Sequence, residues 1–195
     1  MKLGSTAGRA ADRRVVSALV TWLLLAGGAA SEQSGVVSRQ EALNAVFAGA
    51  TITGDRVYLT VEQVERIAEL AREDVRTRIY ARYVARRDGV VVGRAYVDTH
   101  VVRTKRESLL ISLEPDGRVR RIDVTAFLEP PEYIPSERWK GQYYGKPLVD
   151  DVELHRAIRP IAGATLTAHA VNAAVRRVLA LDMVLEGREP GREGQ

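Results

Sequence analysis

From residue 78 to residue 128 the sequence alternates with a period of two and is divided by short turn sequences. Apolar side chains occupy every second position from Ile79 to Ala85, as in a strand with one buried face. Asp88-Gly89 and Pro115-Asp116-Gly117 are residue combinations that form tight turns. Strands that follow one another through such turns pair antiparallel. The pattern predicts an antiparallel sheet, with strands over 78–86, 90–102 and 108–113 and a fourth around 122–128.

Helical signals lie on both sides of this sheet sequence. Ser38 with Glu41, and Thr60 with Gln63, have the spacing of a capping box, in which each side chain bonds to a backbone N–H of the other residue. They predict helices that begin there. Between these helices, residues 51–59 read as a short extended piece that is broken at Gly54-Asp55.

A third helix is predicted near the C-terminus, from about Ala168 to Leu185. Apolar residues recur there every three or four positions, which is the pattern of an amphipathic helix that packs on a sheet. On the same helix, Arg176 and Arg177 are expected to form a solvated face. The fold class expected is therefore α+β, an antiparallel sheet with helices packed against it.

Residues 129–148 form a long stretch rich in proline, glycine and aromatic side chains, with no clear period. We expect an ordered loop with a helical turn around 136–139. Long ordered loops often carry function, so this loop is a candidate wall for a cofactor; packing over the sheet edge explains it equally well.

Charge argues against nucleic acid as a partner. The chain has a formal charge of +4, but the first 30 residues hold four basic residues and one acidic residue, which leaves 25 basic against 24 acidic residues elsewhere. Nucleic-acid binding requires a concentrated basic surface.

The chain has no cysteine, which excludes disulfides, iron–sulfur clusters and thioether-linked haem.

The N-terminal segment has the layout of a secretory signal. Basic residues precede an uncharged run from Val15 to Ala30, and small residues stand at Gly28 and Ala30. We expect residues 1–30 to be a signal peptide or a retained membrane anchor, 31–37 a linker, 38–186 the folded domain and 187–195 a disordered tail. Either form of the N-terminus predicts a periplasmic or other extracytoplasmic location, with anchoring to the inner membrane if the segment is retained.

One motif carries specific chemistry. Ala162-Gly163-Ala164-Thr165-Leu166-Thr167 resembles the acceptor motif of FMN-binding domains, such as the covalently flavinylated domains of the sodium-pumping NADH:quinone reductase and of the Rnf complex. The resemblance implies that a flavin transferase, using FAD and Mg²⁺, transfers FMN to the hydroxyl of Thr167. A phosphate there would lie near the positive end of the final helix.

The same pattern occurs a second time, at residues 48–53, so the motif alone is a weak signal. Context separates the two copies. The first follows a helix and enters a short strand, whereas the second follows the sheet and opens the last helix, as the family's acceptor does. We therefore favour Thr167 over Thr53; simple helix capping by Thr165 and Thr167 is the alternative.

The resemblance to FMN-binding domains extends beyond the motif. It covers roughly 38–185 and includes Asp98-Thr99-His100, the Pro-Asp-Gly turn and the segment 127–133. Two departures from the family pattern are Arg159 and Ala162, where the family often has an acid and a serine.

Three further side chains are candidate contacts of the cofactor. His100 could touch the flavin or be a solvated strand residue, His169 could contact the phosphate or lie on the helix surface, and Tyr133 could line a wall beside the ring. The three histidines lie far apart without an obvious carboxylate partner, so no metal site is expected.

The sequence thus predicts an electron carrier rather than an enzyme with its own substrate. We expect covalent FMN, a flavin transferase as the modifying partner and a membrane electron-transfer protein as donor. Two alternatives stay open: a flavin-dependent reductase with a pocket lined by Tyr133, Tyr143 and Tyr144, and a flavin-free adaptor or binding domain. Sequence signatures of nucleotide-binding and serine-hydrolase sites are missing from the chain.

Overall fold

The structure is a computed structural model that describes residues 35–149 and 151–188. Its centre is one antiparallel sheet of five strands in the order β1-β2-β3-β4-β5, so each strand pairs with its neighbour in sequence. The strands are β1 (Thr51–Tyr58), β2 (Ile79–Arg87), β3 (Val90–Val101), β4 (Arg106–Leu113) and β5 (Val119–Phe127). This arrangement confirms the predicted α+β class with an antiparallel sheet.

Strand β1 corrects one expectation. It pairs with β2 residue for residue from Thr51 to Tyr58, without a break at Gly54-Asp55. The turn after β2 is as predicted, because Asp88 and Gly89 both have positive φ angles, 51° and 80°. Two consecutive left-handed residues give the type I′ turn, whose twist matches that of the strands it joins.

The turn between β3 and β4 is held by a carboxylate from another loop. Glu129 accepts hydrogen bonds from the backbone N–H groups of Arg103 (3.3 Å), Thr104 (2.9 Å) and Lys105 (2.8 Å). These hydrogen bonds lower the pKa of the exposed Glu129 carboxyl. Glu129 therefore fixes the end of the hairpin that carries the C-terminal residues of β3.

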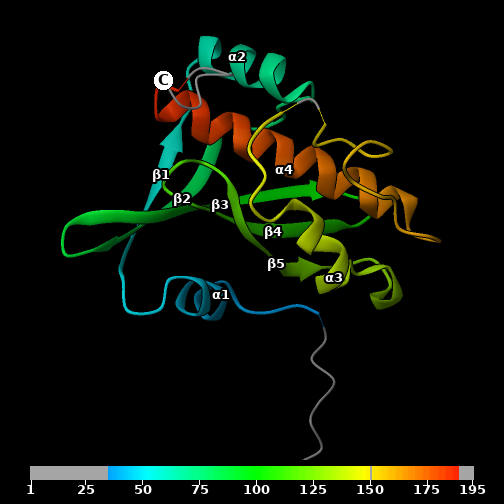
Figure 1. Cartoon of the computed structure of the whole chain (residues 1–195). Helices are drawn as coiled ribbons and strands as arrows, with labels where there is room; N and C mark the ends of the chain where they lie inside the picture. Colours follow the sequence, from blue (N-terminus) through cyan, green and yellow to red (C-terminus); the bar gives the residue numbers. More distant parts are fainter. Residues whose placement is uncertain (1–34, 150, 189–195) are drawn as a thin grey trace, which may run out of the picture. The chain divides into compact units, whose positions relative to one another are not determined.

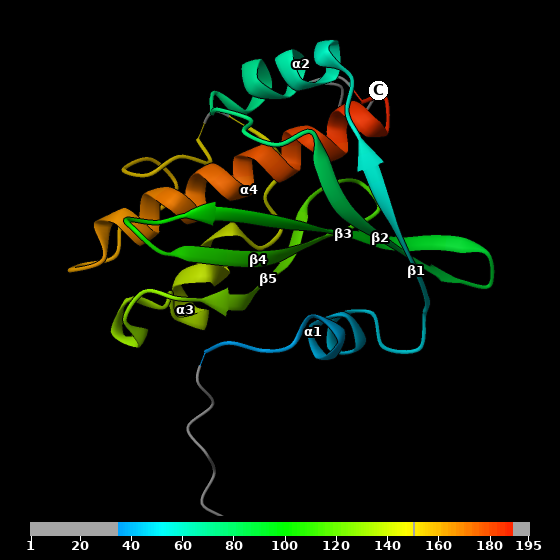
Figure 2. The ribbon, with the colours of Figure 1, turned by 180° about the vertical axis from the view of Figure 1, so that it is seen from behind.

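The helices cover both faces of the sheet. Helix α4 (Thr165–Leu185) lies diagonally across one face with α2 (Val61–Ala71) beside it, and α1 (Arg39–Val46) lies against the opposite face (Figure 1, Figure 2). A short α3 (Glu137–Lys140) lies between the 3₁₀ turns η1 (Pro131–Tyr133) and η2 (Gly141–Tyr143). As predicted, the Ser38 side chain caps α1, and Thr60 with Gln63 forms a complete capping box on α2.

Two apolar clusters hold the three layers together. The larger lies between the sheet and α2 and α4, and the α4 residues Val171, Val175, Val178 and Leu181 are buried in it, as their spacing predicted. The smaller lies under α1, where Leu43 and Phe47 pack on the other face of the sheet. The sheet is therefore buried on both faces where these helices cross it.

A buried ion pair fixes α4 on β3. The Arg94 guanidinium donates to both carboxylate oxygens of Asp182, at 2.5 and 3.0 Å, and the Tyr96 hydroxyl donates to the same carboxylate at 2.8 Å. Both charged side chains are almost wholly buried. Such a pair is stable only while each charge keeps its partner and its hydrogen bonds.

The aromatic loop packs against α4. Trp139 and Tyr143 are buried and meet edge to face at 5.5 Å. The Tyr143 hydroxyl donates to the Asn172 side chain (3.0 Å), and Nε1 of Trp139 donates to the carbonyl of Arg159 (2.6 Å). The helical turn predicted at 136–139 is present as α3. For Trp139 and Tyr143, packing is the correct account of this loop.

The ends of the domain are partly described. Val36, in the predicted linker, forms a parallel bridge with Val124 of β5, and Arg188, in the predicted tail, contacts Asp182. The predicted signal peptide or anchor at 1–30, most of the linker and residues 189–195 lie outside the described residues. Within the described part, no helix has the length and apolar character needed to cross a bilayer.

Removal of the Asp182 carboxylate should strongly destabilise the fold. We expect Asp182→Ala to lower the free energy of unfolding by about 3–5 kcal/mol, because Arg94 keeps a buried charge without its partner. Urea unfolding measures the change. Glu69→Ala, which removes the exposed pair of Glu69 with Arg66, is the control and should cost less than about 1 kcal/mol. Equal effects of the two substitutions would contradict this role for Asp182.

Candidate functional site

The motif segment ends in the first turn of α4. Gly163 has a φ of 79°, and open space surrounds the position of its missing side chain. This left-handed backbone, which L-residues rarely adopt, turns the chain into the helix. Ala164 is the N-cap, and Thr165 is the first helical residue. The helix thus begins three residues earlier than predicted, so both threonines of the motif lie inside it.

The two threonines point in different directions. Residues two positions apart on an α-helix are separated by about 200°. Thr165 is exposed, whereas Thr167 has only 2% of its surface exposed and lies on the buried side of α4 with Val171 and Val178. The expected acceptor, Thr167, is therefore enclosed in the packed core, and the accessible hydroxyl is that of Thr165. Leu166 and His169 are also exposed.

No side chain caps the N-terminus of α4. The N-cap residue Ala164 has no oxygen to accept from the first-turn N–H groups, so the alternative of helix capping by Thr165 or Thr167 is not what this helix uses. In the first backbone hydrogen bond of the helix, the N–H group of Ala168 donates to the carbonyl of Ala164. The preceding N–H groups at the positive end of this 21-residue helix are suited to an anion.

The second copy of the motif has another environment. Thr53 lies in the edge strand β1, and its hydroxyl donates to the carbonyl of Val84 on β2 at 3.3 Å. The copy at 48–53 therefore follows a helix and enters a strand, as its context predicted. It offers no helix N-terminus for a phosphate.

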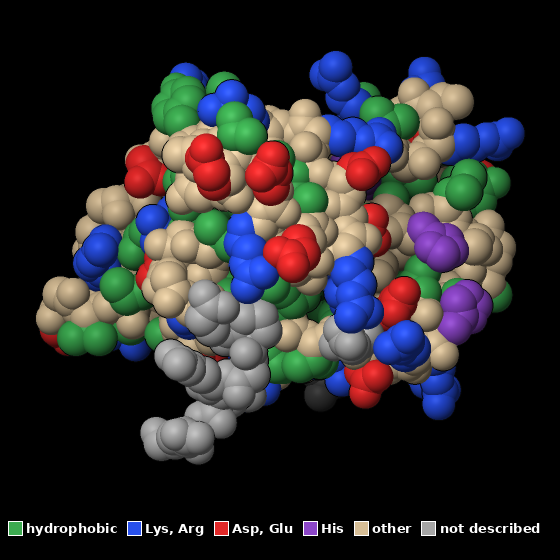
Figure 3. Space-filling view, turned by 90° about the horizontal axis from the view of Figure 1, so that it is seen from above, with side chains coloured by type: hydrophobic (Ala, Val, Ile, Leu, Met, Phe, Trp, Pro, Cys, Tyr) green, Lys and Arg blue, Asp and Glu red, His purple; other side chains and the backbone are tan. Residues whose placement is uncertain are grey.

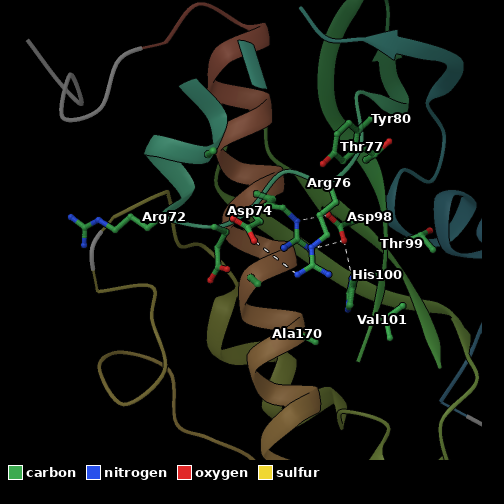
Figure 4. Close-up of a pocket in the computed structure, with 14 residues that line it drawn as sticks. Arg72, Asp74, Arg76, Thr77, Tyr80, Asp98, Thr99, His100, Val101 and Ala170 are labelled. Atoms are coloured by element: carbon green, nitrogen blue, oxygen red, sulfur yellow. Dashed lines mark hydrogen bonds and ion pairs between the residues drawn. The ribbon is translucent and has the colours of Figure 1, made fainter. Parts of the chain in front are cut away.

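A cleft of 720 Å³ lies beside α4, on the side where α2 ends. Its walls are the end of α2 with the loop that follows, the first residues of β2, the last residues of β3 and one stripe of α4. Figure 4 shows Asp98 and His100 of β3 together on one side of it and Ala170 of α4 across from them. Tyr133, Tyr143 and Tyr144, the residues considered for a reductase pocket, are not among its lining residues.

His100 has two carboxylate partners that were not expected from the sequence. Its Nδ1 lies 2.8 Å from Oδ1 of Asp98, and its Nε2 lies 3.0 Å from Oε2 of Glu107, the residue opposite it on β4. Asp98 also accepts two hydrogen bonds from Arg177 of α4, at 2.9 and 3.0 Å. Only a doubly protonated imidazole can donate to both carboxylates, so the geometry favours the cation.

The charges of this network reinforce one another. Burial alone would lower the pKa of His100, but the hydrogen bonds and charges of Asp98 and Glu107 outweigh it and raise the pKa to about 9. Burial would raise the pKa of Asp98, yet its bonds to His100 and Arg177 lower the pKa below its usual value. At neutral pH the Asp98 carboxylate therefore lies between the two cations His100 and Arg177, which corrects the view of His100 as a solvated histidine.

Neither arginine of α4 forms a solvated face. Arg176 is buried and donates to the carbonyls of Ala71 at the end of α2 (2.7 Å) and of Val152 (2.9 Å). Arg177 is largely buried against Asp98. The apolar period of α4 gave no sign of these contacts, because they depend on where α2 and β3 meet the helix.

The remaining surface gives two further observations. On the face that carries α2, basic and acidic side chains are mixed rather than gathered by sign (Figure 3). Within the described residues, no three histidine, cysteine or acidic side chains form a group that could hold a metal ion. Tyr133 is partly exposed in η1 and is not a wall of the cleft.

Comparison with known proteins finds similarity in fold but not in sequence. No family model matches the chain, and neither does any curated protein sequence. Among solved structures, the crystal structure of Shewanella oneidensis NqrC is similar, with a TM-score of 0.51 over 73% of this chain and 88% of that chain. The sequence identity is 16%, so the similarity shows a shared fold.

The ionised His100 should make stability depend on pH. A pKa raised from 6.5 to about 9 on folding contributes stability that is full below pH 6.5 and is lost as pH rises towards 9. Between these pH values, we expect the unfolding free energy of the wild type to fall by up to about 3 kcal/mol more than that of His100→Gln. His169→Gln, at an exposed histidine, should keep the wild-type profile. Parallel profiles for wild type and His100→Gln in urea unfolding would refute a charged His100.

Proposed function

We propose that this domain is an electron carrier with FMN attached covalently at the start of α4. The observation that carries the proposal is the position of the motif: its Ala-Gly-Ala-Thr turn exposes a threonine hydroxyl at the uncapped N-terminus of a long helix. The fold shared with NqrC supports it, because the motif independently resembles the acceptor motif of the FMN-binding domain in the sodium-pumping reductase.

The residues present fit the phosphate end of FMN. The hydroxyl oxygen of a threonine would bond to the phosphorus of the FMN half of FAD; the pyrophosphate bond would break, AMP would leave, and the hydroxyl proton would pass to a base of the Mg²⁺-dependent transferase. The first-turn N–H groups of α4 would then hold the phosphoester. The bound flavin supplies the redox chemistry, and the protein supplies its position and electrostatic surroundings.

Thr165 is the acceptor that we propose. Transfer needs a hydroxyl that a second protein can approach, and Thr165 is exposed next to the open backbone of Gly163. Thr167, which the motif resemblance had indicated, could react only if the first turn of α4 unwound, because its side chain is enclosed. Because Thr167 is buried, the proposed acceptor is Thr165, two residues before it.

The location and partners extend the same proposal. The signal-like sequence at 1–30 supports a periplasmic or other extracytoplasmic site, with or without a membrane anchor. A covalent bond suits such a site, since a freely dissociating cofactor would be lost by dilution. We propose a membrane-associated protein as electron donor and another carrier as acceptor.

Intact mass of the domain co-expressed with a flavin transferase tests the attachment and its position. Substitution of each threonine by valine removes the hydroxyl and keeps the shape of the side chain. We expect the mass of one FMN to be added to the wild type and to Thr167→Val, because both keep the exposed hydroxyl of Thr165. Thr165→Val lacks this hydroxyl and should gain no mass.

The same measurement decides between the alternatives. Thr53→Val is the matched control in the second motif copy and should gain FMN like the wild type. A gain in Thr165→Val that is lost in Thr167→Val would return the acceptor to Thr167. No gain in any form, with the fold intact by circular dichroism, would contradict covalent flavinylation and favour a flavin-free adaptor.

A further inference from the structure

The cleft and the proposed acceptor lie along the same helix. Ala170, Ala173 and Arg177 of α4 line the cleft, and the exposed Leu166 precedes them on the same helical stripe. From Thr165 to Ala173 the helix rises by about 12 Å. The ribityl phosphate chain of FMN is an extended and flexible linker of comparable length, so a ring attached at Thr165 can reach the cleft.

Small side chains give the cleft a flat wall. Ala68 of α2 and Ala170 and Ala173 of α4 all line it, at the place where the two helices approach each other. Larger residues at these positions would close the space between the helices and β3. The alanines instead leave an apolar wall on which a planar aromatic ring can lie, and the loop after α2 adds the charged residues Arg72, Glu73, Asp74 and Arg76 to the lining of the cleft.

Arg177, one turn after Ala173 on α4, supplies a hydrogen-bond donor at the cleft. Arg177 uses Nε and Nη2 to bind Asp98, which leaves the N–H groups of its Nη1 without a partner among the described residues. Asp98 is held in turn by His100, and His100 by Glu107. The guanidinium is therefore fixed in place at the cleft, with one free donor nitrogen.

We propose that this cleft binds the isoalloxazine ring of the attached flavin, with the ring against the alanine wall and Arg177 donating to the carbonyl and nitrogen acceptors of its pyrimidine edge. The inference rests on the proposed covalent FMN. The alanine wall can pack against a planar ring, and the N–H groups of Arg177 can donate to a ring edge that is rich in hydrogen-bond acceptors. A hydrogen bond from Arg177 to this edge stabilises the electron-rich reduced form of the ring and raises its midpoint potential.

Access of a neutral quencher to the flavin tests the site. Ala173→Leu fills the cleft and leaves every residue of the acceptor motif and of the charged network unchanged. We expect the loaded Ala173→Leu variant to show fluorescence quenching by acrylamide that is several-fold stronger than in the wild type and close to that of free FMN. Ala45→Leu, at an exposed alanine of α1 on the other face of the sheet, is the matched control and should behave like the wild type.

A second variant tests the role of Arg177. Arg177→Lys keeps a cation near Asp98 but has fewer N–H groups, and it should shift the midpoint potential of the bound flavin to a more negative value. Intact mass, measured on every variant, separates the two proposals. A normal FMN gain with unchanged quenching in Ala173→Leu and an unchanged potential in Arg177→Lys would overturn the ring site alone. No FMN gain in the wild type would overturn the covalent attachment and this site with it.

Discussion

The geometry of the site depends on two ion pairs between α4 and β3. Asp182 accepts hydrogen bonds from Arg94 and Tyr96 near one end of the interface between α4 and β3. Arg177 donates to Asp98 further along the same interface. Apolar packing alone tolerates small shifts of a helix along a sheet, because a valine or leucine contact has little directionality. Buried charges do not, since a displaced partner would leave a charge unpaired at a cost of several kcal/mol. The two pairs therefore fix both the position and the rotation of α4.

That fixed rotation decides what each residue of α4 can do. Because Asp182 and Arg177 of α4 both point towards β3, Thr167 faces the core and Thr165 faces solvent, although both threonines belong to the same motif. The same rotation places the alanine stripe of α4 at the cleft. A flavin on this helix would be held at its phosphate by the helix N-terminus and at its ring two turns later, both on one rigid element. Sites built on regular elements keep their geometry better than sites built on loops.

Local patterns in the sequence predicted the elements well, and long-range contacts account for what they missed. The N-cap at Ser38, the capping box at Thr60, the Asp88-Gly89 turn and the apolar period of α4 are signals contained within a few residues. The burial of Arg176 and Arg177 depends on α2 and β3, which are far away in sequence, so a helical period could not show it. The two carboxylate partners of His100, by contrast, could have been predicted from the sequence. Asp98 lies two residues before it on the same strand face, and the hairpin register places Glu107 opposite it.

The two copies of the motif show why six residues cannot define an acceptor. Both contain a glycine in the left-handed conformation, Gly49 in one and Gly163 in the other. After Gly49 the chain enters the edge strand, where the Thr53 hydroxyl bonds to a neighbouring strand and the backbone N–H groups point sideways along β1. After Gly163 it enters a helix, whose first N–H groups all point back towards the turn. Only the second arrangement concentrates donors and positive potential on one point, so the element that follows the motif determines whether a phosphate can be held there.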